Sequence, residues 1–98
     1  MSLVINIYYT GEGDNALEFA REMISSGIVD RVREEEGNLG YNYFIPMDDE
    51  NTVLLVDKWK NKEALDIHHK SSMMDEIAKL RNKYKLSMRV EMFTEVEK

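Results

Sequence analysis

The chain contains no cysteine, and only one proline and one tryptophan occur among its 98 residues. The absence of cysteine excludes disulfides, thiolate metal sites, iron–sulfur clusters and covalently attached haem. No run of 18 apolar residues, signal peptide or lipidation motif is present either. We therefore expect a cytoplasmic protein that does not cross or anchor to a membrane.

Positive charge is scarce. Lysine and arginine number 13 against 19 acidic residues, which gives a formal net charge of −6. Because no dense basic cluster reverses this balance locally, we expect neither nucleic acid nor an anionic membrane as a partner. The composition, 43% hydrophobic and 33% charged, is that of an ordinary globular protein. Its length predicts a single domain over residues 1–98 with a thin core.

Four stretches are rich in β-branched and aromatic residues and predict strands: 2–9, 39–47, 52–59 and 86–96. Turn-forming residues 48–51 join the middle two into a hairpin. Between the first two strands, apolar residues at helical spacing predict an amphipathic helix from Ala16, capped by Asp14 or Asn15. The helix is expected to weaken at 25–27 and to stop at Gly37.

A second helical region follows the hairpin and is expected to consist of two pieces. Asn61 can cap its start at Lys62. The apolar positions before and after Ser71 lie on faces about 160° apart, at ~100° per residue, so one straight helix is excluded. Ser72 followed by Asp75 resembles a capping box for the second piece.

The order of elements, βαββαβ, predicts a ferredoxin-like α+β fold with a four-stranded antiparallel sheet. A sheet with one face in water alternates apolar and polar residues, yet segments 3–5, 7–9, 43–45 and 53–56 are apolar on both sides. Since the chain's own helices can cover one face only, we expect a homodimer in which two sheets pack together. The alternative is that the ends of these strands are apolar without a partner sheet covering them.

Three segments carry a family resemblance: EEEGNLGYNYF (34–44), DKW (57–59) and KEALDIHHKSS (62–72). In order and spacing they resemble the antibiotic biosynthesis monooxygenase family. Its usual pattern has an acidic pair, Gly and Tyr entering the second strand. An acidic residue stands two positions before Trp on the third strand, and a helix reads Ala-Leu-x-x-His.

The resemblance implies a dimeric α/β barrel built from two ferredoxin-like subunits, in agreement with the homodimer inferred from the strands. Members of the family include cofactor-free oxygenases of phenolic and quinol compounds. Related members degrade haem or isomerise a phosphorylated signalling sugar. Because one fold supports several reactions, membership does not select among them.

The chain departs from the family pattern at several positions. Members often continue the helix motif with Ser/Thr-Pro-His, whereas this chain has Ser71-Ser72-Met73 and so lacks a second ring nitrogen. Asp57 stands where Glu is usual. The haem-degrading branch resembles the chain at Asn6, but its helix Trp falls near residues 67–68 and its later His near Ala78. Two of its three signature residues are absent, so we do not expect haem degradation.

The two histidines are adjacent on the predicted helix, so they point about 100° apart and only one can face a small site. His68 shares the apolar face with Ala64 and Leu65, while His69 lies on the flank in water. An ordinary histidine pKa of about 6.5 suits a proton acceptor near neutral pH. With the family's helix histidine at this position, we predict that His68 is catalytic. The alternative is a hydrogen-bonded core histidine.

Substrate-binding roles are predicted for Asn6, Trp59, Tyr41 and Tyr43. An asparagine in an apolar strand must find partners or destabilise the fold. The period of two places Asn6 with Tyr8 on one face of its strand, Trp59 with Asp57, and Tyr41 with Tyr43. Whether these faces coincide does not follow from the sequence. For the aromatic residues the alternative is packing in the core.

These residues suit a cofactor-free oxidation, because dioxygen reacts faster with a phenolate or quinol anion than with the neutral compound. A base in a dry pocket activates such a substrate without flavin or metal, and nearby N–H or O–H donors stabilise the developing oxyanion. We therefore hypothesise a monooxygenase of small planar phenolic or quinol-type compounds that needs no cofactor. The alternatives are an isomerase of the same family and a non-catalytic barrel that binds a small ligand.

Other features receive structural interpretations. Residues 33–36, Arg-Glu-Glu-Glu, are most simply a solvated helix end, with a glutamate pairing across the dimer as the alternative. The histidines and nearby carboxylates lack a recognisable metal-ligand spacing, so no metal site is predicted. Segment 11–13 is too short and too acidic to cradle phosphate. The methionines Met73, Met74, Met88 and Met92 are assigned to the core.

Overall fold

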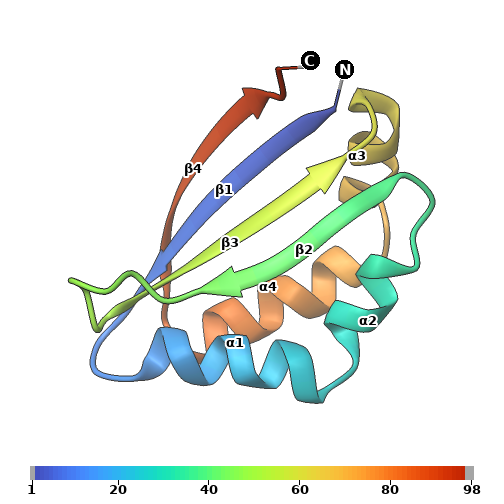
Figure 1. Cartoon of the computed structure of the whole chain (residues 1–98). Coiled ribbons are helices and arrows are strands. Elements are labelled where there is room, and N and C mark those ends of the chain that lie inside the picture. Colours follow the sequence, from blue (N-terminus) through green and yellow to red (C-terminus); the bar gives the residue numbers. More distant parts are fainter. Residues whose placement is uncertain (1, 97–98) are drawn as a thin grey trace.

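The computed structural model describes residues 2–96; the remaining residues of the expected 1–98 domain, Met1, Glu97 and Lys98, lie outside that part. Four antiparallel strands form one sheet, with the helices on one of its faces (Figure 1). The elements are β1 (Leu3–Thr10), α1 (Asn15–Ser25), α2 (Ile28–Arg33), β2 (Asn38–Phe44), β3 (Thr52–Trp59), α3 (Lys62–His69), α4 (Met73–Lys83) and β4 (Ser87–Thr94). The strand order β2-β3-β1-β4 confirms the ferredoxin-like prediction.

Both predicted helix breaks are confirmed. Gly27 adopts a left-handed conformation (φ +85°) between α1 and α2, and α3 ends at His69 before α4 begins at Met73. The cap by Asn61 is also confirmed, because its side chain accepts a hydrogen bond of 2.9 Å from the Ala64 N–H.

Two other predicted caps are wrong. Ser72 has a helical φ and its hydroxyl caps nothing, so the capping box does not form. At the start of α1, Asp14 makes no capping hydrogen bond, and the Asn15 side chain donates instead to the Tyr84 carbonyl oxygen at 3.1 Å. Short polar side chains near a helix start have several partners within reach, so the sequence alone does not select one.

The strand limits differ from the sequence estimate mainly near the single proline and at turns. β2 ends at Phe44, before Pro46, whose missing N–H cannot continue the ladder. β4 is shorter at both ends than residues 86–96, and the left-handed Lys85 (φ +55°) precedes it. The hairpin between β2 and β3 is as predicted.

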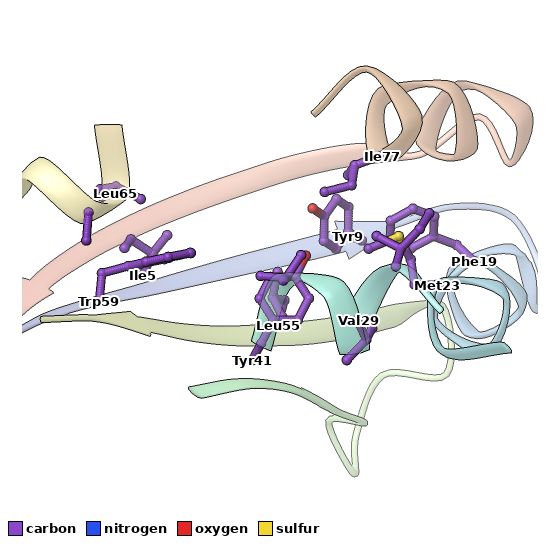
Figure 2. Packing of buried hydrophobic residues seen from close by; sticks show 13 residues of the cluster. Ile5, Tyr9, Phe19, Met23, Val29, Tyr41, Leu55, Trp59, Leu65 and Ile77 are labelled. Carbon is purple, nitrogen blue, oxygen red and sulfur yellow. The ribbon is translucent and has the colours of Figure 1, made fainter. Parts of the chain in front are cut away.

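The core lies between the sheet and the helices (Figure 2). Alternate residues of β1 and β3 point into it, including Ile5, Tyr9, Leu55 and Trp59, all buried. Met73 and Met74 pack against its edge, but Met88 and Met92 of β4 are 48% and 57% exposed. Their assignment to the core is therefore wrong. They face the helical side, and the helices do not extend far enough to bury them.

The opposite face of the sheet has no covering layer among residues 2–96 (Figure 1). It presents Val4, Leu54 and Val56, all half-buried, together with Phe44 and Phe93, which are 52% and 50% exposed. Apolar residues on both faces of the sheet are therefore confirmed. No helix of residues 2–96 is long and apolar enough to cross a membrane.

Gly37 fixes the approach of α3 to the start of β2. It has φ +87°, and a Cβ atom at this position would lie 2.5 Å from the Ala64 Cβ. Its carbonyl oxygen also accepts a 2.8 Å hydrogen bond from the Lys60 N–H. The left-handed stop predicted here is confirmed, and it brings the turn after α2 against the first turn of α3.

We predict that Gly37→Ala lowers the free energy of unfolding by about 2–4 kcal/mol, since strained φ and a steric overlap add. The control is Gly13→Ala, where φ is +52° but no atom lies within 4 Å of the added Cβ. That variant should cost about 1 kcal/mol in urea unfolding. If both variants lose the same unfolding free energy, the close contact of residue 37 with Ala64 of α3 does not contribute to the cost.

Candidate functional site

His68 is buried against the end of β3. It lies on α3 with Ala64 and Leu65 on the buried face, and is 3% exposed. Its ring stacks on Trp59, with centroids 4.7 Å apart and planes inclined by 28°. His69 points outward and is exposed, as predicted from the helical rotation. The structure therefore brings together two of the predicted site residues, His68 and Trp59.

Glu35 holds the His68 ring in place. Its Oε2 lies 2.8 Å from His68 Nδ1, and its side chain is 18% exposed. A carboxylate at Nδ1 favours the tautomer with the proton on that nitrogen, which leaves a lone pair on Nε2. Residues 33–36 are therefore not simply a solvated helix end, because Glu35 pairs within its own chain. Only the family's acidic pair signalled this role in the sequence.

Asp57 lies beside Trp59 on the helical side of β3. The indole Nε1 donates to Asp57 Oδ1 at 3.3 Å, and the carboxyl is 5% exposed. Burial raises the pKa of Asp57 to about 7, against a smaller lowering by the Trp59 hydrogen bond. Among residues 2–96, no lysine or arginine forms an ion pair with it.

Tyr41 and Tyr43 lie on the same side of the sheet as Asp57, with Tyr41 directly opposite it in the β2–β3 register. Their rings meet edge to face at 6.0 Å. Burial raises the pKa of both hydroxyls, and that of Tyr9 on β1 to about 12. The Tyr43 hydroxyl is buried without a hydrogen-bond partner in the described part of the chain. Figure 2 shows the hydroxyls of Tyr9 and Tyr41 on the helical side.

Asn6 lies on the other face of the sheet. It pairs with Val56 of β3 and Glu91 of β4, and its neighbours Ile5 and Ile7 point to the helical side. The face shared by Asn6 and Tyr8 is therefore opposite to that of His68. The hypothesis that Asn6 donates into the same pocket as His68 is corrected, since the sheet itself separates the two side chains.

Arg81 of α4, which the sequence did not reveal, lies at the Tyr9 end of the buried tyrosines. Its Nη1 lies 3.5 Å from Met88 Sδ, and its charge lowers the pKa of Tyr9 against the larger effect of burial. The other arginines all donate to an oxygen, whereas Arg81 has no oxygen partner within residues 2–96. A cation without an anion beside a buried phenol can stabilise a developing negative charge.

The site thus combines an oriented imidazole, a buried carboxyl and tyrosine hydroxyls on the helical side of one sheet, while Arg81 lies at the far end of β1, beside Met88 and Tyr9. Such groups accept and donate protons and stabilise an oxyanion. Within residues 2–96, no group of three or more His, Asp or Glu side chains is arranged to hold a metal ion.

We predict that Asp57 makes folding stability fall as pH rises from 4 to 7. Its pKa is 3.8 when unfolded and about 7 when folded, so over this range only the folded state retains the proton. Asp57→Asn should remove up to about 4 kcal/mol of this decline. Urea unfolding of both proteins at several pH values measures the difference. Asp66 is half exposed on α3, so Asp66→Asn is the control and should keep the wild-type dependence of unfolding free energy on pH. If Asp57→Asn also keeps that dependence, the assignment to Asp57 is wrong.

Comparisons with known proteins agree with this architecture. The model of the family described as "Antibiotic biosynthesis monooxygenase" matches residues 2–80. The Bacillus subtilis (strain 168) protein named "Putative monooxygenase YcnE" is 30% identical over 70 residues, which span 71% of this chain and 72% of that protein.

Solved structures show the same fold. SnoaB from Streptomyces nogalater, a cofactor-independent oxygenase, superposes with a TM-score of 0.80 at 12% identity, covering 99% of this chain and 95% of that one. A protein from Deinococcus radiodurans gives a TM-score of 0.84 at 13% identity, covering 98% and 94%. Together with the family match, these findings confirm the resemblance in residues 34–72. The chain belongs to the antibiotic biosynthesis monooxygenase family.

Proposed function

We propose that the protein is a cytoplasmic, cofactor-independent monooxygenase that oxidises a small planar phenolic or quinol-type compound with dioxygen. The observation that carries the proposal is the Glu35–His68–Trp59 arrangement, in which a carboxylate orients a buried imidazole against an indole. Family membership and the fold shared with SnoaB support the same class of reaction.

In this proposal His68 Nε2 removes the proton from the substrate hydroxyl. Glu35 holds Nδ1 and stabilises the imidazolium that forms, because the two opposite charges lie 2.8 Å apart. The resulting anion transfers an electron to dioxygen more readily than the neutral compound does. The hydroxyls of Tyr41 and Tyr43, on the same side of the sheet as Asp57, stabilise charge that develops on oxygen.

The proposal places the substrate on the helical side of the sheet. Trp59 and Tyr41 are almost fully buried there, whereas Met88, Val90 and Met92 of β4 face the same side and are 48–57% exposed. Half-exposed methionine and valine side chains suit the face of a planar aromatic ring.

We predict that His68→Ala lowers kcat for oxygen uptake at least about 100-fold, since it removes the general base. Glu35→Gln should cause a smaller loss, because the hydrogen bond remains but the charge does not. The measurement is oxygen consumption with a panel of phenols and quinols. His69→Ala is the matched control and should keep wild-type activity, as His69 is exposed. Equal activity of all four proteins would refute the role of His68.

We also propose that the protein is a homodimer that packs the free faces of two sheets together. The support is the uncovered apolar face that carries Phe44 and Phe93. On this proposal Asn6 lies within the interface and not beside His68.

Phe93→Glu should convert the dimer to a monomer, because it places a charge on this face. Ile24→Glu is the control, since Ile24 is 56% exposed on the helical layer. Sedimentation at micromolar concentration should give twice the 11.5 kDa chain mass for the wild type and for the control. A wild-type monomer would rule out the dimer.

A further inference from the structure

Asp57 is a buried carboxyl with too few partners for a purely structural role. Its one hydrogen bond within residues 2–96 comes from Trp59 Nε1, at 3.3 Å. A buried carboxylate usually accepts several hydrogen bonds or pairs with a cation, because leaving water is costly. The indole N–H needs an acceptor, but an uncharged amide oxygen would serve equally well. The acid itself therefore requires another explanation.

The groups around Asp57 are weak acids and not cations. Tyr9 on β1 and Tyr41 and Tyr43 on β2 lie near enough for the Asp57 charge to raise the pKa of each hydroxyl, beyond the larger effect of burial. The buried hydroxyl of Tyr43 has no hydrogen-bond partner among the described residues. The cluster thus concentrates proton-bearing groups in one place on the helical side.

The charged groups on the helices near this cluster have other contacts. Arg33 of α2 directs its guanidinium to the Tyr41 carbonyl oxygen and the Asn42 side chain. Arg81 of α4 contacts Met88 and acts on Tyr9. Within residues 2–96 no cation therefore holds Asp57 ionised, and its raised pKa is consistent with a proton retained near neutral pH.

Trp59 connects Asp57 to the proposed base. Its ring stacks on His68, and its N–H edge contacts Asp57. One rigid side chain thus fixes an acid and a base relative to each other. Figure 2 shows this ring lying along the sheet beneath Leu65 and ending near Ile5.

We propose that Asp57 is the second proton-transfer group of the site: it protonates the peroxide formed when dioxygen adds to the substrate ring, and then removes the ring proton. This assignment rests on the monooxygenase proposed above. It divides the proton transfers of the reaction between two residues: His68 acts on the substrate hydroxyl, and Asp57 acts at the oxygenated carbon.

The steps balance for a phenol with hydrogen at the para carbon. His68 takes the hydroxyl proton, and the phenolate gives one electron to dioxygen. Recombination forms a carbon–oxygen bond and a peroxide anion, which takes the Asp57 proton to become a hydroperoxide. The Asp57 carboxylate then removes the ring hydrogen, and the electron pair forms the new C=O bond as the O–O bond breaks. The departing hydroxide takes the proton from His68, so the products are a quinone and water.

The sole tryptophan provides a test of Asp57 ionisation without substrate. We expect the fluorescence of Trp59 to show a transition between pH 5 and 9 that persists in His68→Gln and is absent in Asp57→Asn. A carboxylate formed beside the indole N–H changes its emission. If the Asp57→Asn and wild-type curves coincide, Asp57 does not change ionisation there and the proposal is overturned.

The activity test uses 1-naphthol, whose para carbon carries hydrogen, with oxygen uptake and mass analysis of the products. Asp57→Asn should lower kcat at least about 100-fold. The residual product should shift toward the hydroperoxide, which keeps both oxygen atoms. Circular dichroism checks that the variant is folded, and Asp66→Asn controls for the loss of a carboxyl.

The outcomes separate the two proposals. An active wild type with an equally active Asp57→Asn protein overturns the role of Asp57 and leaves the monooxygenase intact. A wild type that consumes no oxygen with 1-naphthol or any compound of the phenol and quinol panel overturns both. Loss of activity in Asp57→Asn with a normal product ratio and an unchanged pH profile would assign Asp57 a structural role only.

Discussion

The packing of α3 against Trp59 is the contact on which the site depends. The Trp59 ring is fully buried, and His68 stacks on it from the buried face of α3. Gly37 allows the first turn of that helix to approach, because its missing side chain leaves room for Ala64. The same close approach brings Glu35 to His68. Burial of the Trp59 ring thus helps to position the hydrogen-bonded pair of Glu35 and His68.

Much of this fold follows from period and turn chemistry. The strand-like segments, the breaks at Gly27 and Ser71 and the cap by Asn61 were each predictable, because they depend on residues near in sequence. The pairing of Asp57 with Trp59 on one face of β3 followed from alternation alone. Helix rotation likewise distinguished the buried His68 from the exposed His69.

The relation between strands could not be predicted in the same way. Alternation places Asn6 and Tyr41 on a face of their own strands, but the register between strands decides which faces coincide. Asn6 consequently lies opposite the residues with which it was grouped. Glu35 and Arg81 were missed for a related reason: their contacts with His68 and Met88 depend on where separate elements end in space.

The edge strand β4 contributes exposed apolar residues to the proposed substrate site on one face and to the proposed dimer interface on the other. Met88, Val90 and Met92 face the helical side and Phe93 the free side, and all four are about half exposed. A partner sheet on the free face would cover Phe93 but leave the other three facing the helices. The exposed strip of Met88, Val90 and Met92 would then remain open on the helical side. Exposed apolar residues on both faces of β4 are what the proposed dimer and the proposed substrate would each cover.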